Sequence, residues 1–403
     1  MAELEKGARI GAWVVERMLG RGSFGITYLA RHSDPKLSRL LVAIKEFYPS
    51  DLVSRREDGT IAVSRKAKAQ FEAERSQFLE EAQAVASISH PNIVTVQDFI
   101  LANGTSYIVM QLARGPSLLD RVGTRRKPGT AGIYDVEALR PMLAQLLDAL
   151  DTIHNASPPL LHRDIKPQNI IIDEQSGRPI LLDFGAARQF SAGLSHKMTA
   201  ILTKGFAPYE QYTLTDEEFE EEYDDLASGG LVSMPRQGPW GDIYALGAVC
   251  HYALTGAPPP DSLRRKLGAA SYTPLGQRVE GPAEFLHLID RALAIEPTDR
   301  FQTAGDWMRA IDRDDMRHPR QAGVITGNGE GDDQGDGKVV KPAASSGMMV
   351  LMAGFGLAML IAIIFLISTS GPSDQQALDS YNQITDSQTM ENAEAGMATR
   401  RAM

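Results

Sequence analysis

Short runs of alternating hydrophobic and polar residues dominate the first part of the chain, and this pattern is typical of β-strands. One helical pattern interrupts them, because apolar residues recur every three or four positions across residues 71–88. The predicted strands, one of them a continuous apolar run at 40–47, cover residues 13–19, 26–30, 40–47, 93–99 and 106–112. The sequence thus begins with a strand-rich unit that contains one helix.

Helical spacing takes over further along the chain. Apolar residues from Leu139 to Ile153 mark a long amphipathic helix, and Pro141 is expected to fix or kink its start. A strand-rich part followed by a helix-rich part indicates an α+β fold of two lobes.

A third pattern is an apolar run without any charge at residues 348–367. Its length of about 20 residues is what a helix needs to cross a bilayer. A buried core helix is the alternative, but such a helix would carry a polar stripe, which this run lacks. The sequence therefore predicts one transmembrane helix.

The flanks of this run predict its orientation. Lys338 and Lys341 precede it closely, whereas the next basic residues after it are Arg400 and Arg401. The positive-inside rule then places the preceding part in the cytoplasm and the helix in the cell inner membrane.

Composition divides the chain into four predicted segments. Residues 1–312 form the main domain, and residues 313–347 are polar and glycine-rich, as expected of a flexible juxtamembrane linker. Residues 348–367 form the membrane helix. Residues 368–403 form a short tail outside the cytoplasm with few large apolar residues, which predicts no folded domain there.

Charge and cysteine content exclude several classes of function. The net charge of −10 disfavours general nucleic-acid binding, which needs a basic surface. The single cysteine, Cys250, excludes a disulfide framework and any site built from several cysteines. Its apolar neighbours predict a buried, unreactive thiol, consistent with a reducing compartment.

Gly20, Gly22 and Gly25 form the pattern G-x-G-x-x-G, which is weak evidence when taken alone. In a dinucleotide-binding fold this pattern opens a helix, but here a strand-like segment follows. The glycines are therefore expected to form a strand–loop–strand flap whose backbone N–H groups approach phosphate oxygens. Lys45, on the next strand, would present an ammonium group to the same phosphates, although alone it is more simply an exposed strand lysine.

Two further motifs follow the long helix: HRDIKPQN at residues 162–169 and DFG at residues 183–185. An Asp can accept the proton of a hydroxyl group, and an Asn with a second Asp can hold Mg²⁺. These are the parts that phosphoryl transfer requires. Each motif could occur alone by chance. The glycine pattern, the strand lysine Lys45, the HRDIKPQN motif and the DFG motif in this order, however, indicate phosphoryl-transfer chemistry.

With these motifs, residues 10–311 resemble the eukaryotic-like Ser/Thr protein kinases of bacteria. The resemblance implies an α+β, two-lobed fold, with a small β-rich N-lobe at about residues 10–113 and a larger helical C-lobe at about residues 114–312. It implies ATP and Mg²⁺ as cofactors, with Mn²⁺ as an alternative metal. Proteins bearing Ser or Thr would be the substrates, because Lys166 stands two positions after the expected base. The expected role is membrane-linked signalling with autophosphorylation.

The resemblance also assigns the nucleotide site. Lys45 would contact the α- and β-phosphates and pair with Glu81 on the first long helix, with Glu80 as the competing candidate. Met110 would be the gatekeeper of the adenine pocket, and residues 111–113 the hinge. The expected ATP-binding residues are Gly20, Gly22, Gly25, Ala43, Lys45 and Met110.

The reacting groups follow in the same way. By resemblance, Asp164 would be the catalytic base and Lys166 the contact of the γ-phosphate. Asn169 and Asp183 would be the metal ligands. Asp242 would brace the loop that carries the base.

Regulatory and structural residues complete the resemblance. Arg163 would bind a phosphate on the activation segment, with Ser195 and Thr199 as the better phosphosites and Thr203 bonded to the catalytic loop. Glu210, in Ala-Pro-Tyr-Glu where the family has Ala-Pro-Glu, would pair with Arg300.

Three features are not explained by the family pattern. The connections from Lys45 to Glu81 and from Glu210 to Asp242 are long. The second contains an acidic run at residues 216–225, either a solvated loop or a docking surface for basic substrates. In the membrane run, small residues spaced four apart predict a homodimer face, made of Gly354, Ala358 and Ala362.

Three functions are compatible with phosphoryl-transfer motifs. An active, membrane-anchored protein kinase needs Lys45, Asp164, Asn169 and Asp183, and all four are present. A pseudokinase scaffold would have lost some of them. A small-molecule kinase would lack a peptide-docking segment like that before Glu210. The sequence favours the active protein kinase.

Overall fold

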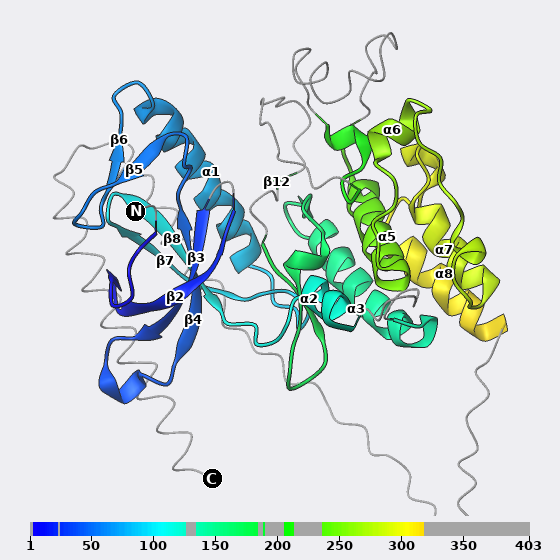
Figure 1. Ribbon diagram of the computed structural model, residues 1–403, viewed down its shortest axis with the longest axis horizontal. Coiled ribbons are helices and arrows are strands. Elements are labelled where there is room, and N and C mark those ends of the chain that lie inside the picture. Colours follow the sequence, from blue (N-terminus) through cyan, green and yellow to red (C-terminus); the bar gives the residue numbers. More distant parts are fainter. Residues whose placement is uncertain are drawn as a thin grey trace, which may run out of the picture. The chain divides into compact units, whose positions relative to one another are not determined.

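The computed structural model describes residues 3–22, 25–125, 134–183, 188–189, 205–212 and 236–317, and every structural statement below refers to these residues. They belong to one compact unit, Met1–Gly323. Within this unit, Figure 1 shows one part that consists of a sheet with the long helix α1 beside it, and a second part that consists of packed helices. The α+β, two-lobed prediction is therefore correct for this part of the chain.

The smaller lobe is built on a six-stranded sheet in the order β1-β2-β3-β4-β8-β7, with antiparallel neighbours. Helix α1 (Lys68–Ala86) packs on it through an aromatic cluster in which Phe47 contacts Phe71 and Phe78 at ring distances of 5.4 and 5.3 Å. The strands are β1 (Arg9–Ile10), β2 (Trp13–Arg21), β3 (Gly25–His32), β4 (Leu41–Phe47), β7 (Val96–Ala102) and β8 (Thr105–Gln111).

One strand is displaced from its prediction. The sequence pattern predicts a strand at 93–99, but β7 begins at Val96. The reason is a contact outside the sheet: Ile93 forms a parallel bridge with Leu181, and the N–H of Val94 donates to the Leu181 carbonyl at 3.0 Å. Residues 93 and 94 thus belong to the junction between the lobes.

The long connection after Lys45 contains a hairpin that the sequence pattern did not predict. Strands β5 (Val53–Arg55) and β6 (Ile61–Val63) pair antiparallel beside α1 (Figure 1). Three residues are too few to display a period-two pattern. A short helical turn, η1 (Pro35–Leu37), connects β3 and β4.

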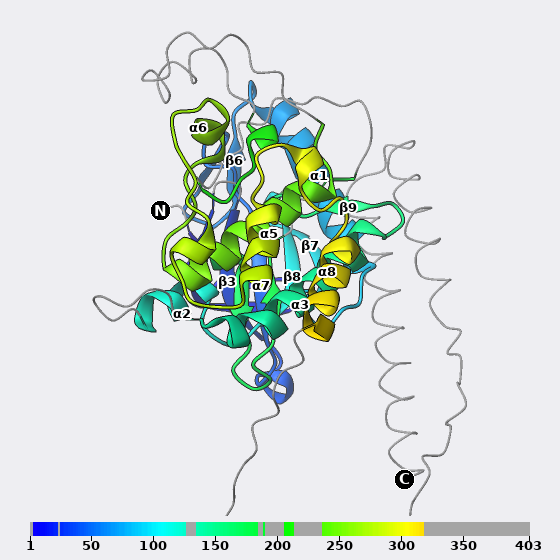
Figure 2. The same cartoon turned by 90° about the vertical axis from the view of Figure 1, so that its right-hand side faces the viewer.

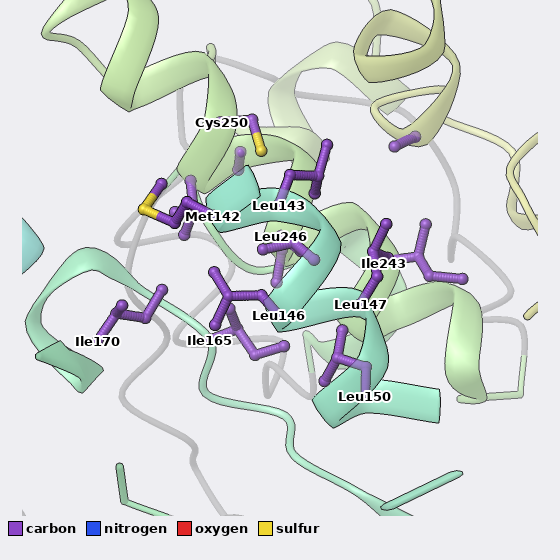
Figure 3. Close-up of a cluster of buried hydrophobic side chains, with 14 of the residues drawn as sticks. Met142, Leu143, Leu146, Leu147, Leu150, Ile165, Ile170, Ile243, Leu246 and Cys250 are labelled. Carbon is purple, nitrogen blue, oxygen red and sulfur yellow. The ribbon is translucent and has the colours of Figure 1, made fainter. Parts of the chain in front are cut away.

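The larger lobe packs around α5 (Pro239–Thr255), most of whose side chains are buried. Figure 2 shows α5 among α3, α7 and α8, and Figure 3 shows Leu143 and Leu147 of α3 meeting Ile243 and Leu246 of α5. The other helices are α2 (Leu118–Arg125), α3 (Val136–His154), α6 (Ser262–Lys266), α7 (Ala283–Ala292) and α8 (Ala304–Arg317). Short strands β9 (Leu160–Leu161), β10 (Ile170–Ile172), β11 (Pro179–Leu181) and β12 (Arg188–Gln189) accompany them.

The start of α3 differs from the prediction based on Pro141. The helix begins at Val136, and Pro141 lies inside it. Asp135 sets the start, because its carboxylate accepts a hydrogen bond from the N–H of Ala138 at 2.7 Å. An N-cap upstream of the proline therefore decides where the helix begins.

Cys250 lies in the core of the larger lobe with a relative exposure of 1% (Figure 3). Burial raises the pKa of its thiol, as expected of an unreactive cysteine. In the part of the chain that the structure describes, no helix has both the length and the apolarity to cross a membrane, and residues 348–367 lie outside that part.

Candidate active site

The glycine-rich turn joins β2 to β3, and the surroundings of Gly25 show why glycine is needed at that position. A Cβ on Gly25 would lie 2.3 Å from the carbonyl oxygen of Glu46, so no other residue fits without moving β4. The N–H of Gly22 donates to the Gly25 carbonyl at 2.8 Å and closes the turn. A Cβ on Gly20 would meet no atom within 4 Å, which leaves the backbone there open to a ligand.

Lys45 lies on β4 opposite Thr27 of β3 and Ile108 of β8. Its Nζ contacts the Asp183 carboxylate from the other lobe. Both residues line one small pocket with Glu81 of α1 and Met110 of β8. The remaining lining residues are apolar: Phe78, Ala82, Val85, Val94, Val96 and Ile108.

The two glutamates proposed as partners of Lys45 differ in position. Glu81 lines this pocket, whereas Glu80 is exposed and accepts a hydrogen bond from Ser76 at 3.3 Å. Ala43 pairs with Met110 across β4 and β8. The geometry favours Glu81 over Glu80.

The segment at residues 162–169 is held by Asp242 of α5. Its carboxylate accepts the backbone N–H groups of His162 and Arg163, each at 2.8 Å, and Arg163 has a positive φ of 64°. His154 Nε2 lies 2.8 Å from the same carboxylate. Burial would raise the pKa of Asp242, yet the hydrogen bonds and charge of these partners hold that pKa below its usual value. A fixed anion thus sets the shape of the loop.

Asp164 is the centre of the polar groups on this loop. Its Oδ2 lies 2.8 Å from Lys166 Nζ and accepts a hydrogen bond from Asn169 Nδ2 at 2.9 Å. Asn169 Nδ2 also donates to the Asp164 carbonyl at 2.8 Å. Because both side-chain contacts within the described residues use Oδ2, Asp164 Oδ1 is left to accept a proton from a hydroxyl group.

The hairpin of β10 and β11 brings Asn169 and Asp183 to the same place. Ile170 pairs with Leu181, and the N–H of Leu182 donates to the Asn169 carbonyl at 2.7 Å. His162 Nε2 donates to the Leu182 carbonyl at 3.0 Å, and burial lowers the pKa of His162. The residue that follows Leu182, Asp183, has a positive φ of 59°.

The donor atoms of these two residues fit a magnesium ion. The Asn169 amide nitrogen is engaged by Asp164, so its Oδ1 remains as a ligand, and the Asp183 side chain is 40% exposed. Among the described residues, no cluster of three or more His, Cys, Asp or Glu could hold a metal by itself. Mg²⁺ commonly takes one or two protein oxygens and completes its shell with substrate phosphates.

A second region of the larger lobe anchors residues 205–212. Arg300 forms a two-pronged ion pair with Glu210, at 2.6 and 3.2 Å, and both side chains are 0% exposed. Ser262 Oγ donates to the Ala207 carbonyl at 2.8 Å. The extra Tyr209 donates to Glu296 at 3.2 Å and lies under Lys266.

The model of the protein kinase domain family matches residues 13–308. The chain belongs to the protein kinase family. It is 30% identical over 318 residues to the serine/threonine-protein kinase PknF of Mycobacterium tuberculosis, covering 76% of this chain and 57% of PknF. It is 27% identical to PknA of Nostoc sp., covering 76% of this chain and 48% of PknA. The chain thus spans about half the length of these curated relatives.

A solved structure supports the same family. The apo form of PpkA-294 superposes with a TM-score of 0.61 at 36% identity, covering 77% of this chain and 100% of that one. Of the residues that the kinase resemblance singled out, Lys45 and Asp183 line one pocket, and Asn169 bonds Asp164.

Several predicted kinase residues lie outside the described residues. They are Ser195, Thr199, Thr203, Gly354, Ala358, Ala362 and the acidic run at 216–225. Conversely, His154, which contacts Asp242 from the end of α3, is not among the residues predicted from the sequence. A histidine in the last turn of a helix that leads into the 162–169 motif was the available signal.

Proposed function

We propose that this protein is a Ser/Thr protein kinase that transfers the γ-phosphoryl group of Mg-ATP to hydroxyl groups of proteins. The supporting observation is the convergence of Lys45, Asp164, Lys166, Asn169 and Asp183 from separate strands and loops. The named relatives are serine/threonine-protein kinases, which supports the same chemistry.

Each of these side chains has a separate proposed role in the transfer. Asp164 Oδ1 accepts the proton of the Ser or Thr hydroxyl group, and Lys166, bonded to Oδ2, would contact the transferred phosphoryl group. Lys45 contacts the α- and β-phosphates. Asn169 and Asp183 would hold Mg²⁺, which when bound neutralises phosphate charge. The main contribution of the chain is positioning.

The two alternative functions have less support. A pseudokinase scaffold has no need of a bonded Asp164–Lys166–Asn169 group, and the chain retains it intact. A small-molecule kinase has no need of a rigid peptide-docking segment. Residues 205–212 are anchored by the buried Glu210–Arg300 pair, which favours protein substrates.

The test replaces the proposed metal ligand. The Asp183→Asn variant of the full chain should lose at least about a hundredfold in Mg-ATP-dependent phosphorylation of casein, because a neutral amide binds Mg²⁺ more weakly than a carboxylate. Raising the Mg²⁺ concentration should restore part of the activity, as measured by ³²P transfer. Wild-type transfer by Asp183→Asn at low Mg²⁺ would remove this residue from the metal site.

We further propose that Ser195 and Thr199 are autophosphorylation sites, because a phosphate there could form charge-assisted hydrogen bonds with Arg163. Thr203 is proposed to bond the catalytic loop instead. Phosphopeptide mass spectrometry of the wild-type reaction above, with Asp183→Asn as the unreacted reference, locates the sites. Full activity of the double Ser195→Ala and Thr199→Ala variant would contradict their role.

We also propose that residues 348–367 anchor the kinase in the inner membrane, with residues 1–312 in the cytoplasm. The support is the charge-free apolar run and the two lysines before it. The small residues Gly354, Ala358 and Ala362 share one helix face, so two such helices can approach closely and form a homodimer.

This dimer should depend on the small-residue face. In a membrane two-hybrid assay, Gly354→Ile with Ala358→Ile is expected to reduce self-association severalfold, because the larger side chains keep the helices apart. Leu357→Ile, which keeps the size of a neighbouring side chain, is the control and should associate normally. Equal signals from wild type and the double variant would leave the helix as a plain anchor.

A further inference from the structure

The hairpin of β5 and β6 is joined to the sheet of the N-lobe by a buried ion pair. Arg55 at the end of β5 donates to Glu46 of β4 at 2.5 Å, and the two side chains are only 3% and 0% exposed. The hydroxyl groups of Tyr28 and Tyr107 also donate to the Glu46 carboxylate, at 2.9 and 2.8 Å. Each oxygen of this buried carboxylate therefore has a partner.

The surroundings keep these donors in place. Burial, together with the charge of Glu46, raises the pKa of both Tyr28 and Tyr107, so the phenol groups stay protonated and continue to donate. A buried ion pair loses most of its Coulomb energy to desolvation, so its main effect is to fix geometry. The position of Arg55, and of the hairpin that carries it, is thereby set relative to β4.

Tyr48 connects this fixed point to the glycine-rich turn. It follows β4 directly and is 4% exposed. The guanidinium of Arg55 lies over its ring at 5.0 Å, and that of Arg21 lies over the same ring at 6.0 Å. Arg21 stands between Gly20 and Gly22, in the turn that would cover the phosphates.

The other end of the turn is held against the same strand. Gly25 approaches the backbone of Glu46 so closely that no Cβ would fit. The turn is therefore tied to β4 at Gly25 by backbone packing and at Arg21 by the ring of Tyr48. A turn with three glycines has many conformations to lose when it closes on a ligand, and such contacts reduce that loss.

We propose that Tyr48 is a positioning residue for ATP: through Arg21 it holds the glycine-rich turn in the conformation that receives the phosphates. This inference rests on the proposed kinase function. It also gives a role to the long connection after Lys45, which supplies Tyr48 and the hairpin. Tyr48 itself does not touch the nucleotide.

The direct test compares Tyr48→Leu with Tyr48→Phe in the full chain. Leucine removes the aromatic face, whereas phenylalanine keeps it and loses only a hydroxyl group. By isothermal titration calorimetry, Tyr48→Leu should bind Mg-ATP about three- to fivefold more weakly, as expected for one lost cation–π contact. Tyr48→Phe should bind like wild type. The KM for ATP should rise by the same factor, with kcat and the KM for casein unchanged.

A second pair of variants distinguishes loss of the Tyr48–Arg21 contact from structural damage to the hairpin of β5 and β6. Arg21→Gln removes the same contact from the side of the turn and should weaken ATP binding to a similar extent. Arg17→Gln, an exposed arginine of the same strand, is the matched control and should have no effect. Hydrogen exchange should become faster at residues 18–27 in Tyr48→Leu and Arg21→Gln only.

The outcomes separate the possible roles. Equal ATP affinity in Tyr48→Leu, Tyr48→Phe and Arg21→Gln would overturn the proposal. A fall in kcat together with a lower melting temperature, without a selective change in ATP binding, would make Tyr48 purely structural and would also overturn it. Wild-type protein that binds ATP but transfers no phosphate would contradict the proposed function alone, because the binding ratios would still test Tyr48.

Discussion

Replacing Asp164 with asparagine is expected to lower kcat for protein phosphorylation by about a thousandfold, the contribution typical of a well-placed general base. An asparagine has nearly the same shape and leaves an oxygen for Lys166, so the loop should keep its form. It cannot accept the proton of the substrate hydroxyl group, however. The affinity for Mg-ATP should change little, because the nucleotide is proposed to be held by other residues.

Steady-state kinetics and calorimetric ATP binding measure the two effects separately. Asp173→Asn is the matched control, because Asp173 is a half-buried aspartate in the turn between β10 and β11, where its carboxylate accepts hydrogen bonds from Ser176. It should retain full activity. An Asp164→Asn enzyme with more than about a tenth of the wild-type kcat would show that another group removes the proton.

Arg300→Met should destabilise the kinase domain by about 3–5 kcal/mol, the usual effect of removing one partner from a buried ion pair. The Glu210 carboxylate would stay buried without its guanidinium partner. Arg300 also donates to the carbonyl groups of Ala294 and Ile295, at 2.8 and 2.7 Å, and these bonds would be lost as well. Urea unfolding of the full chain, followed by tryptophan fluorescence, measures the change.

An exposed ion pair provides the comparison. Arg309 pairs with Asp306 at 2.7 Å on the surface of α8, with side chains 65% and 43% exposed. Arg309→Met should therefore cost less than about 1 kcal/mol. Similar losses for Arg300→Met and Arg309→Met would mean that burial of the Glu210–Arg300 pair has no bearing on stability.

The sequence predicted those parts of the fold that depend on local patterns. Strands β2 and β3 carry strand-like patterns on either side of a glycine turn, and α1 and α3 carry apolar residues at helical spacing. Each of these elements was therefore predicted within a few residues of its bounds. The hairpin of β5 and β6 was missed because its strands have only three residues each, and its buried Arg55–Glu46 contact joins residues of different strands. The spacing of hydrophobic residues along the sequence cannot reveal such a contact.

The sequence likewise predicted only part of the candidate site. Short motifs carry Asp164, Asn169 and Asp183 together with their order along the chain, and the family resemblance supplies proposed roles. The motifs do not identify the residues that hold these groups in position. His154 reaches Asp242 from the end of α3, and the ring of Tyr48 contacts two arginines, Arg21 and Arg55, that are distant in sequence. Such support depends on tertiary packing, which only a structure reveals.

The burial of Cys250 has a practical consequence for spectroscopy. It is the single cysteine of the chain, it is 1% exposed, and its thiol has a raised pKa. Maleimide and methanethiosulfonate reagents attack exposed thiolates, so the folded wild-type protein should remain unlabelled. One cysteine introduced on each lobe would therefore accept a pair of spin labels without first removing a native thiol, and the distance between the labels would report any change in lobe separation when ATP is added.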